Sequence, residues 1–380
     1  MDSLKNEKLF TRNFILTTLS TFALFASFYF LLVTLPTYIR VLGGTESQIG
    51  LIIGVFTISA VLLRPHIGRE VDRRGRKNVL IAGLLIFLLS MLLYDYTTSV
   101  TSLLLLRVFQ GIGWGAATTA AITLIADISP ANRRGEAMGL YGMAANVAMA
   151  TGPLLSEMLL EAYNFPALFA ISAAIAFISL LLVLPVSETK VEHPVTPLFS
   201  KEALFPSALM FMVTVTYGSI VSFLPLFVEK HDIGVKAGIF FTVFAITLII
   251  IRVLAGKLSD ARGRKFVIVP GMFLIALGLW VLSTASSPQS FLAAALLYGM
   301  GFGSVHPALV ALLVDRVGES GRGAAMGTFT AAFDLGIGSG SIILGVVLQY
   351  FGFMVMYLLG GLIVIAGAVW FISVNDKKGK

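Results

Sequence analysis

Long apolar stretches recur along almost the whole chain, and they limit its possible folds more than any other feature. Each is about 20 residues long, the length at which a helix crosses a bilayer, and short polar connections separate them. Only 12% of the residues are charged and 57% are hydrophobic, whereas a soluble domain carries about 25% charged residues. We therefore predict twelve membrane spans, near residues 14–36, 47–63, 78–94, 99–125, 135–160, 166–184, 204–228, 236–254, 266–285, 289–314, 323–350 and 354–373.

The spans are expected to be helices. Backbone N–H and C=O groups cannot stay unpaired in hydrocarbon, and barrel strands would alternate apolar with polar residues over about ten positions. The first stretch is as long as the others and has no small-residue cleavage site, so we interpret it as a retained helix rather than a signal peptide. The predicted fold class is an all-α membrane protein.

The basic residues predict the orientation. Of the 27 Lys and Arg residues, Arg107 lies within a span and Arg40, Lys230 and Lys236 lie on one side, while the rest lie on the other. By the positive-inside rule, the basic side and both termini are cytoplasmic, which requires an even number of spans. We expect a multi-pass protein of the inner (plasma) membrane, and we attribute the net charge of +7 to topology rather than to nucleic-acid binding.

An internal repeat divides the chain. The string GREVDRRGRK at residues 68–77 returns as GKLSDARGRK at residues 256–265, an offset of 188 residues that also aligns many positions between Gly50 and Gly139 without a gap. An even number of helices in each copy gives a parallel repeat about an axis along the membrane normal. We predict two pseudo-symmetric six-helix bundles, residues 1–185 and 204–380, joined by a cytoplasmic linker at 186–203.

The repeated string resembles the signature loop of the major facilitator superfamily, Gly-x-x-x-Asp-x-x-Gly-Arg-Lys. Small residues permit a tight turn, and an Asp at a helix end can pair with basic groups or with the amino end of a helix. The resemblance implies the major facilitator fold and a conformational gate, while the basic residues also serve topology. The gate residues would be Gly68, Asp72, Arg73, Gly75, Arg76 and Lys77, with Gly256, Asp260, Gly263, Arg264 and Lys265 in the second copy, where Ala261 replaces a basic residue.

Two further motifs lie within the first half. Arg107, Gln110 and Gly111 in the fourth span resemble the family's second motif; Arg107 could serve function or reach the membrane surface with its long side chain. Gly142, Gly152 and Pro153 in the fifth span partly match the antiporter motif of the superfamily's twelve-helix drug exporters, although close helix packing explains small residues equally well.

Several polar residues are candidates for binding substrate or protons. The family resemblance places the first, fourth, seventh and tenth spans around a cavity and implies as lining residues Tyr29, Arg107, Gln110, Trp114, Tyr217, Tyr298 and His306. Asp334 lies deep in the eleventh span, and we predict that it and His306 carry proton coupling. The repeat places Asn146 at the position of Asp334, so a packing role beside Gly336, Gly338 and Gly340 is the alternative.

These features predict a secondary active transporter that works by alternating access. The preferred hypothesis is proton-coupled export of a small organic molecule, and the alternative is import by a symporter or facilitator. A membrane enzyme is disfavoured because we find no metal-ligand cluster, nucleophile motif or phosphate-binding loop, and a receptor or channel leaves two carrier loops unexplained. With no cysteine in the chain, cysteine-ligated metals and disulfides are excluded. We expect no catalytic residue, cofactor, metal or nucleic-acid partner, and a monomer in the lipid bilayer.

Overall fold

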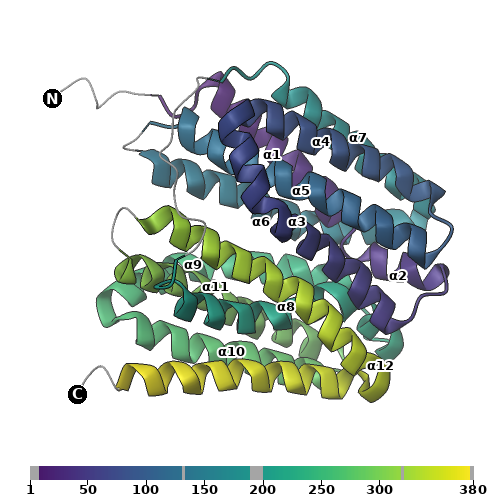
Figure 1. The fold of residues 1–380 in the computed structure, drawn as a ribbon. Helices are drawn as coiled ribbons and strands as arrows, with labels where there is room; N and C mark the ends of the chain where they lie inside the picture. Colours follow the sequence, from purple (N-terminus) through teal and green to yellow (C-terminus); the bar gives the residue numbers. More distant parts are fainter. Residues whose placement is uncertain (1–7, 131–132, 189–199, 318–320, 377–380) are drawn as a thin grey trace. The chain divides into compact units, whose positions relative to one another are not determined.

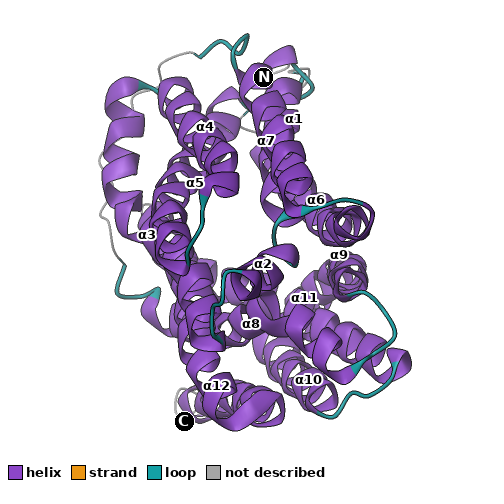
Figure 2. Ribbon diagram, turned by 90° about the vertical axis from the view of Figure 1, so that its right-hand side faces the viewer, coloured by secondary structure: helices purple, strands orange, loops and turns teal. Residues whose placement is uncertain are grey.

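The computed structural model describes residues 8–130, 133–188, 200–317 and 321–376, and this part of the chain consists of helices and their connections (Figures 1 and 2). The helices before residue 200 are α1 Arg12–Phe30, α2 Thr34–Val41, α3 Glu46–Arg74, α4 Arg76–Leu93, the short 3₁₀ helix η2 Tyr94–Tyr96, α5 Val100–Ile128, α6 Arg134–Ala162 and α7 Phe165–Val183. Those after it are α8 Leu204–His231, α9 Ala237–Arg262, α10 Arg264–Ser283, α11 Pro288–Arg316 and α12 Arg322–Asp376.

The all-α membrane fold is confirmed. Within the described residues, eleven helices are long and apolar enough to cross a membrane. The last of them, α12, is 55 residues long and is interrupted at Gly352, where φ is +81°, so it holds the eleventh and twelfth predicted spans. Large apolar side chains point outward from the helices, with Leu62 65% exposed and Leu105 66% exposed, as expected of surfaces that face lipid.

Two helix boundaries differ from the prediction. The first span is broken between Phe30 and Thr34, because Pro36 has no N–H to donate to the carbonyl of residue 32. The N–H groups of Leu31 and Leu32 instead bond three residues back. The second difference is that α3 continues to Arg74 instead of ending near residue 63, so Gly68 and Asp72 lie in a helix and not in a loop. In the second copy, α9 likewise continues to Arg262.

The chain divides into two compact units, Met1–Thr34 with Ser59–Pro194, and Leu35–Ile58 with Val195–Lys380. In the first unit, α1 packs against α6 and α7, and α4 against α5 and α7 (Figure 1). In the second, α12 packs against α8 and α10, and α11 against α9 and α10. The repeat-related pairs α4–α5 and α10–α11 therefore pack in the same way.

Residues 35–58 pack in the second unit, although the repeat assigns them to the first half of the sequence. The contact is close, since a Cβ added to Gly54 in α3 would lie 2.5 Å from the carbonyl oxygen of Gly338 in α12. The division into halves at 1–185 and 204–380 describes the sequence repeat and remains a prediction. The central part of the predicted linker, 189–199, lies outside the described residues.

Matched glycines set the spacing of the repeat-related pairs. A Cβ added to Gly113 in α5 would lie 2.9 Å from the carbonyl oxygen of Gly83 in α4, and one added to Gly301 in α11 would lie 2.5 Å from that of Gly271 in α10. Such contacts are shorter than real Cβ atoms make, and a backbone carbonyl cannot turn aside as a side chain can. Small residues let membrane helices pack closely where the hydrophobic effect cannot drive them together.

We therefore expect Gly301→Ala to destabilise the protein by about 1–3 kcal/mol, the cost of overpacking a filled interface. Gly327→Ala is the matched control, because nothing lies within 4 Å of an added Cβ there. Alanine favours a helix over glycine by about 1 kcal/mol, so the control should be neutral or slightly stabilised. Thermal unfolding of the purified proteins in detergent measures both, and an unchanged midpoint for Gly301→Ala would contradict the packing argument.

Candidate functional site

A single left-handed glycine forms the turn between α3 and α4. Gly75 has φ of +92°, a conformation that other residues adopt only with strain. It is the one residue between the end of α3 at Arg74 and the start of α4 at Arg76. The turn therefore places the end of one helix against the beginning of the next, and Arg76 becomes the first residue of α4.

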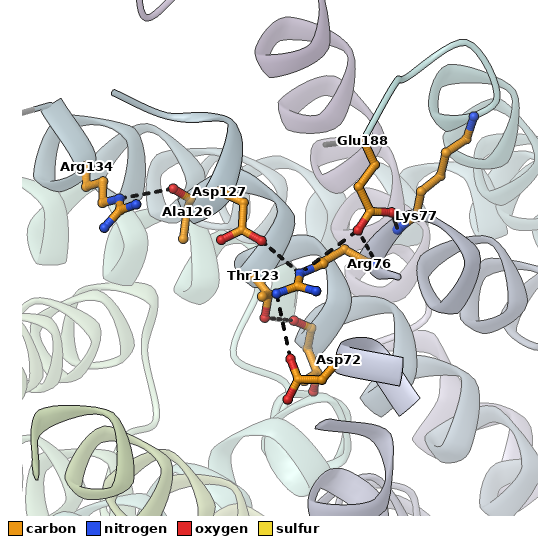
Figure 3. A network of polar contacts seen from close by, with 9 residues as sticks. Asp72, Arg76, Lys77, Thr123, Ala126, Asp127, Arg134 and Glu188 are labelled. Carbon is orange, nitrogen blue, oxygen red and sulfur yellow. Dashed lines mark hydrogen bonds and ion pairs between the residues drawn. The ribbon is translucent and has the colours of Figure 1, made fainter. Parts of the chain in front are cut away.

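Arg76 is the centre of a buried ionic cluster (Figure 3). Its Nε donates to Oδ2 of Asp127 at 2.8 Å, and the two side chains are only 3% and 5% exposed. Asp72, one turn earlier in α3, lies 3.7 Å from the same guanidinium and is largely exposed. Since Asp127 belongs to α5, the cluster ties together the ends of α3, α4 and α5.

Glu188 caps the amino end of α4. Its two carboxylate oxygens accept the backbone N–H groups of Arg76 at 2.6 Å and Lys77 at 2.9 Å. A carboxylate at this end satisfies donors that have no partner within the helix and complements the helix dipole. A Cβ at Gly75 would lie 2.9 Å from Glu188, and Lys77 Nζ donates to the Leu184 carbonyl at 2.7 Å. The segment after α7 is thereby fixed to the first unit.

The second copy of the motif builds a similar cluster in the second unit. Gly263 has φ of +88° and separates α9 from α10. Arg264 Nε donates to Oδ2 of Asp315 at 2.8 Å, and its NH1 group donates to Oδ1 of Asp260 at 2.5 Å. Here the side chains are more open, with Arg264 23% and Asp315 49% exposed. Water therefore screens this cluster, whereas the Arg76–Asp127 pair of the first cluster is shielded from solvent.

Asp127 and Glu188 are the residues that the motif alone does not identify. The repeat aligns Asp127 with Asp315, and this was the available sign that both acids matter. For Glu188, nothing in the sequence indicated its role as a helix cap. Among the other predicted gate residues, Arg73 is exposed on α3, Lys265 is the second residue of α10, and Gly68 and Gly256 have open space where a Cβ would stand.

The polar group of the fourth predicted span is buried in the first unit. Arg107 and Gln110 lie one turn apart on α5, and Tyr94 of η2 reaches the same point. Gln110 Oε1 accepts from the Arg107 NH1 group and from the Tyr94 hydroxyl, each at 2.7 Å. Arg107 is 4% exposed, so the guanidinium is held within the unit and does not reach out along the helix surface.

Tyr29 and Trp114 belong to one aromatic group in the first unit. The Trp114 ring lies 4.5 Å from that of Phe28 and 5.0 Å from that of Phe25, and Tyr29 stacks on Phe25 at 6.2 Å. The predicted lining residues of the first and fourth spans thus meet through phenylalanines of α1.

The partial antiporter motif lies in α6. A Cβ at Gly152 would stand 3.1 Å from the Cβ of Tyr29 in α1, so this glycine permits close approach, and Pro153 follows it within the helix. Gly142 has nothing within 4 Å of an added Cβ. Asn146 lies partly buried between them. Close packing therefore explains Gly152 but leaves Gly142 without a steric reason.

The second unit contains a continuous row of aromatic rings. Tyr217 of α8 lies 5.5 Å from Phe302 of α11, which is 6.2 Å from Tyr298 and 6.3 Å from the His306 ring. The Tyr298 hydroxyl is 3.0 Å from Oγ1 of Thr216. Three of the predicted residues, Tyr217, Tyr298 and His306, are thus connected through Phe302.

Asp334 lies partly buried on α12 beside the glycines that contact neighbouring helices. Added Cβ atoms at Gly336 and Gly340 would meet α8, and one at Gly338 would meet α3. The predicted close-approach face therefore exists, which leaves packing and proton coupling as two roles for the same stretch. In the described residues, no group of three His, Asp or Glu side chains could hold a metal ion.

Comparison with known proteins assigns the chain to a family. The model of the Major Facilitator Superfamily matches residues 17–264 and 235–380. An uncharacterized MFS-type transporter of Methanocaldococcus jannaschii, MJ1560, is 26% identical over 91% of this chain and 94% of that protein. The staphylopine export protein of Staphylococcus aureus is 29% identical over 85% of this chain and 86% of that protein.

A solved structure shares the fold. A crystal structure of a mutant of the nucleoside transporter NupG matches with a TM-score of 0.82, over 95% of this chain and 99% of that one, at 14% sequence identity. At this identity the likeness extends to the fold and not to the substrate.

The contrast between the two ionic clusters gives a matched test. Asp127→Asn leaves the buried Arg76 without its closest carboxylate, and breaking a buried pair costs about 3–5 kcal/mol. Asp315→Asn removes the same group from the exposed cluster, where a pair contributes about 0–1 kcal/mol. We expect thermal unfolding in detergent to show a large loss for the first variant and little change for the second. Equal losses would contradict the assignment of the stronger cluster to the first unit.

Proposed function

The chain belongs to the Major Facilitator Superfamily, and from this premise we propose that it exports a small organic molecule in exchange for protons by alternating access. Members of this family are membrane transporters and not enzymes, so the chain is a multi-pass transporter of a small solute. Direction, coupling ion and the gating role of the motif residues are the parts that we propose.

The observation that carries the mechanism is that each unit builds its own Arg–Asp–Asp cluster at the same repeat position. In the first unit the cluster ties α3, α4 and α5 together, and in the second it ties α9, α10 and α11. A unit whose helix ends are tied can move as a rigid body, which is what alternating access by rocking requires. We assign the gate to Asp72, Arg76 and Lys77 and to their counterparts Asp260, Arg264 and Lys265.

Export is favoured over import by the relatives and by α6. The staphylopine export protein is named for moving its solute outward and is similar along most of the chain. In α6, Gly142, Gly152 and Pro153 partly match the antiporter motif of the family's exporters, and nothing lies within 4 Å of a Cβ added at Gly142. Import by a symporter or facilitator is the alternative.

Proton coupling is assigned to Asp334 with His306. Both lie in predicted spans of the second unit, where ionisable side chains usually serve a function. Such a group can bind a proton from one side and release it to the other when its surroundings change. The repeat-related residue Asn146 cannot titrate, so exchange would depend on one unit.

Exchange can be tested with inside-out membrane vesicles that are acidified inside and contain a pH-sensitive dye. Adding an exported solute should dissipate the gradient, because uptake into the vesicle releases protons outward. Staphylopine is a suitable first probe, chosen from the name of a relative that is 29% identical. A solute that dissipates the gradient is then radiolabelled and loaded into proteoliposomes. If the rate of its movement does not change when a pH gradient is imposed, the antiport mechanism is contradicted and a facilitator is supported.

Asp334→Asn separates coupling from packing, since it keeps the shape and hydrogen-bonding capacity of the side chain but removes its titration. We expect uphill transport driven by a pH gradient to fall about tenfold or more, while exchange of solute for solute persists. Asp232→Asn, at an exposed helix end where φ is +47°, is the control because Asn tolerates that conformation. Wild-type uphill transport in Asp334→Asn would make Asp334 structural.

A further inference from the structure

Arg252, which the basic-residue count assigned to the cytoplasmic side, lies in a helix that is long and apolar enough to cross a membrane. It lies in α9, 10 residues before the last residue of that helix, and is partly buried. Its Nε is shielded from solvent and has no hydrogen-bond partner. No ion pair to Arg252 occurs among the residues described. An unpaired guanidinium in low dielectric is costly, and ionisable groups in spans usually serve a function.

The packing of two helices brings Arg252 and His306 to the same level of the second unit. A Cβ added to Gly299 in α11 would lie 3.0 Å from the Cβ of Thr247, and one added to Gly303 would lie 3.1 Å from the Cα of Leu248. The backbones of α9 and α11 are therefore very close at this level. Arg252 follows Leu248 by about one turn and His306 follows Gly303 by nearly one turn, and the Arg252 charge acts electrostatically on His306.

Three phenylalanines surround the His306 ring. Phe302 stacks on it at 6.3 Å with an interplanar angle of 11°. Phe329 and Phe333 of α12 meet it edge to face at 6.0 and 5.7 Å. Phe302 and Phe329 are buried, while His306 and Phe333 keep part of their surface open. This part of the second unit thus combines the Arg252 guanidinium, the His306 imidazole and a wall of aromatic rings.

We propose that Arg252 and His306 bind the carboxylate of an organic anion and that Phe302, Phe329 and Phe333 contact its apolar body. The guanidinium has five N–H donors in a planar fork that suits a carboxylate, and each imidazole tautomer offers one more. The aromatic wall excludes small hydrated anions and favours a solute with an apolar ring or chain. This inference deepens the proposed function, since it assigns the transported solute to the organic anions.

The competing explanation is that Arg252 extends to the membrane surface and contacts lipid phosphate, as long basic side chains do near helix ends. Both explanations supply an anion to the guanidinium, but they differ in the aromatic body that the ligand must carry and in their dependence on lipid charge. An experiment in bilayers of two compositions separates them.

The test is equilibrium binding of radiolabelled 1-naphthoate to the full-length protein in nanodiscs of neutral phosphatidylcholine, repeated with anionic phosphatidylglycerol. The neutral 1-naphthamide and the cationic 1-naphthylmethylamine are competitors of nearly the same shape. We expect 1-naphthoate to bind in both lipids and the other two to compete at least about tenfold more weakly, the factor for one charged hydrogen bond. Equal competition by the amide in the wild-type protein would overturn the proposal without any variant.

Variants then assign the site. Arg252→Gln should weaken naphthoate binding at least about tenfold, and Arg252→Lys should restore part of it because the charge is kept but the fork is lost. Lys257→Gln is the control, since it removes an exposed charge from the same helix. Size-exclusion profiles identify a variant that fails to fold, and the wild-type series decides the question in that case. If Arg252→Gln binds naphthoate normally and loses only its response to phosphatidylglycerol, Arg252 is a lipid contact and the proposal is wrong.

The assay contains no proton gradient, so its outcome is independent of antiport. Failure of naphthoate selectivity with intact proton exchange overturns the anion site alone. Intact naphthoate binding without any response to a pH gradient overturns proton coupling alone.

Discussion

The structure depends on the inability of lipid to hydrogen-bond with a polypeptide backbone. Each span must satisfy its own N–H and C=O groups, so helices are imposed wherever the chain is apolar for about 20 residues. The hydrophobic effect cannot hold these helices together, because lipid tails are as apolar as leucine. The helices are instead held by close contacts between their backbones. Glycines such as Gly113 and Gly301 make these contacts possible at repeat-related positions. For the same reason, a charged side chain buried within the spans is costly unless it has a partner.

The strongest ionic contacts therefore lie at the helix ends rather than within the spans. Arg76 is enclosed by Asp127 and by the Glu188 cap at the start of α4, whereas its counterpart Arg264 shares two exposed carboxylates. A buried pair resists separation and an exposed pair is weakened by water and salt. The two clusters have similar connections but different exposure, so we expect separation of the helix ends to cost more free energy in the first unit than in the second.

Much of this architecture could be predicted from the sequence, because apolar length, basic loops and an offset of 188 residues are local signals. Gly75 and Gly263 were identified as turn residues for the same reason, and both adopt positive φ. Contacts between distant segments could not be predicted. Asp127 is 51 residues from Arg76 and Glu188 is 112 residues from it, and only packing shows that they meet. The extension of α3 through Gly68 was missed because a glycine inside a helix and one in a turn look alike in a sequence.

Differences between the repeats show where symmetry ends. Arginine occurs at both 64 and 252, and aspartate at both 127 and 315, but Thr118 corresponds to His306 and Asn146 to Asp334. The titratable members of both unlike pairs belong to the second unit. The second unit therefore holds His306 and Asp334 together with Arg252, whose Nε has no hydrogen-bond partner among the described residues. If the proposed proton coupling and anion binding both hold, they act within one unit, where a change of charge at one group alters the binding free energy at the others.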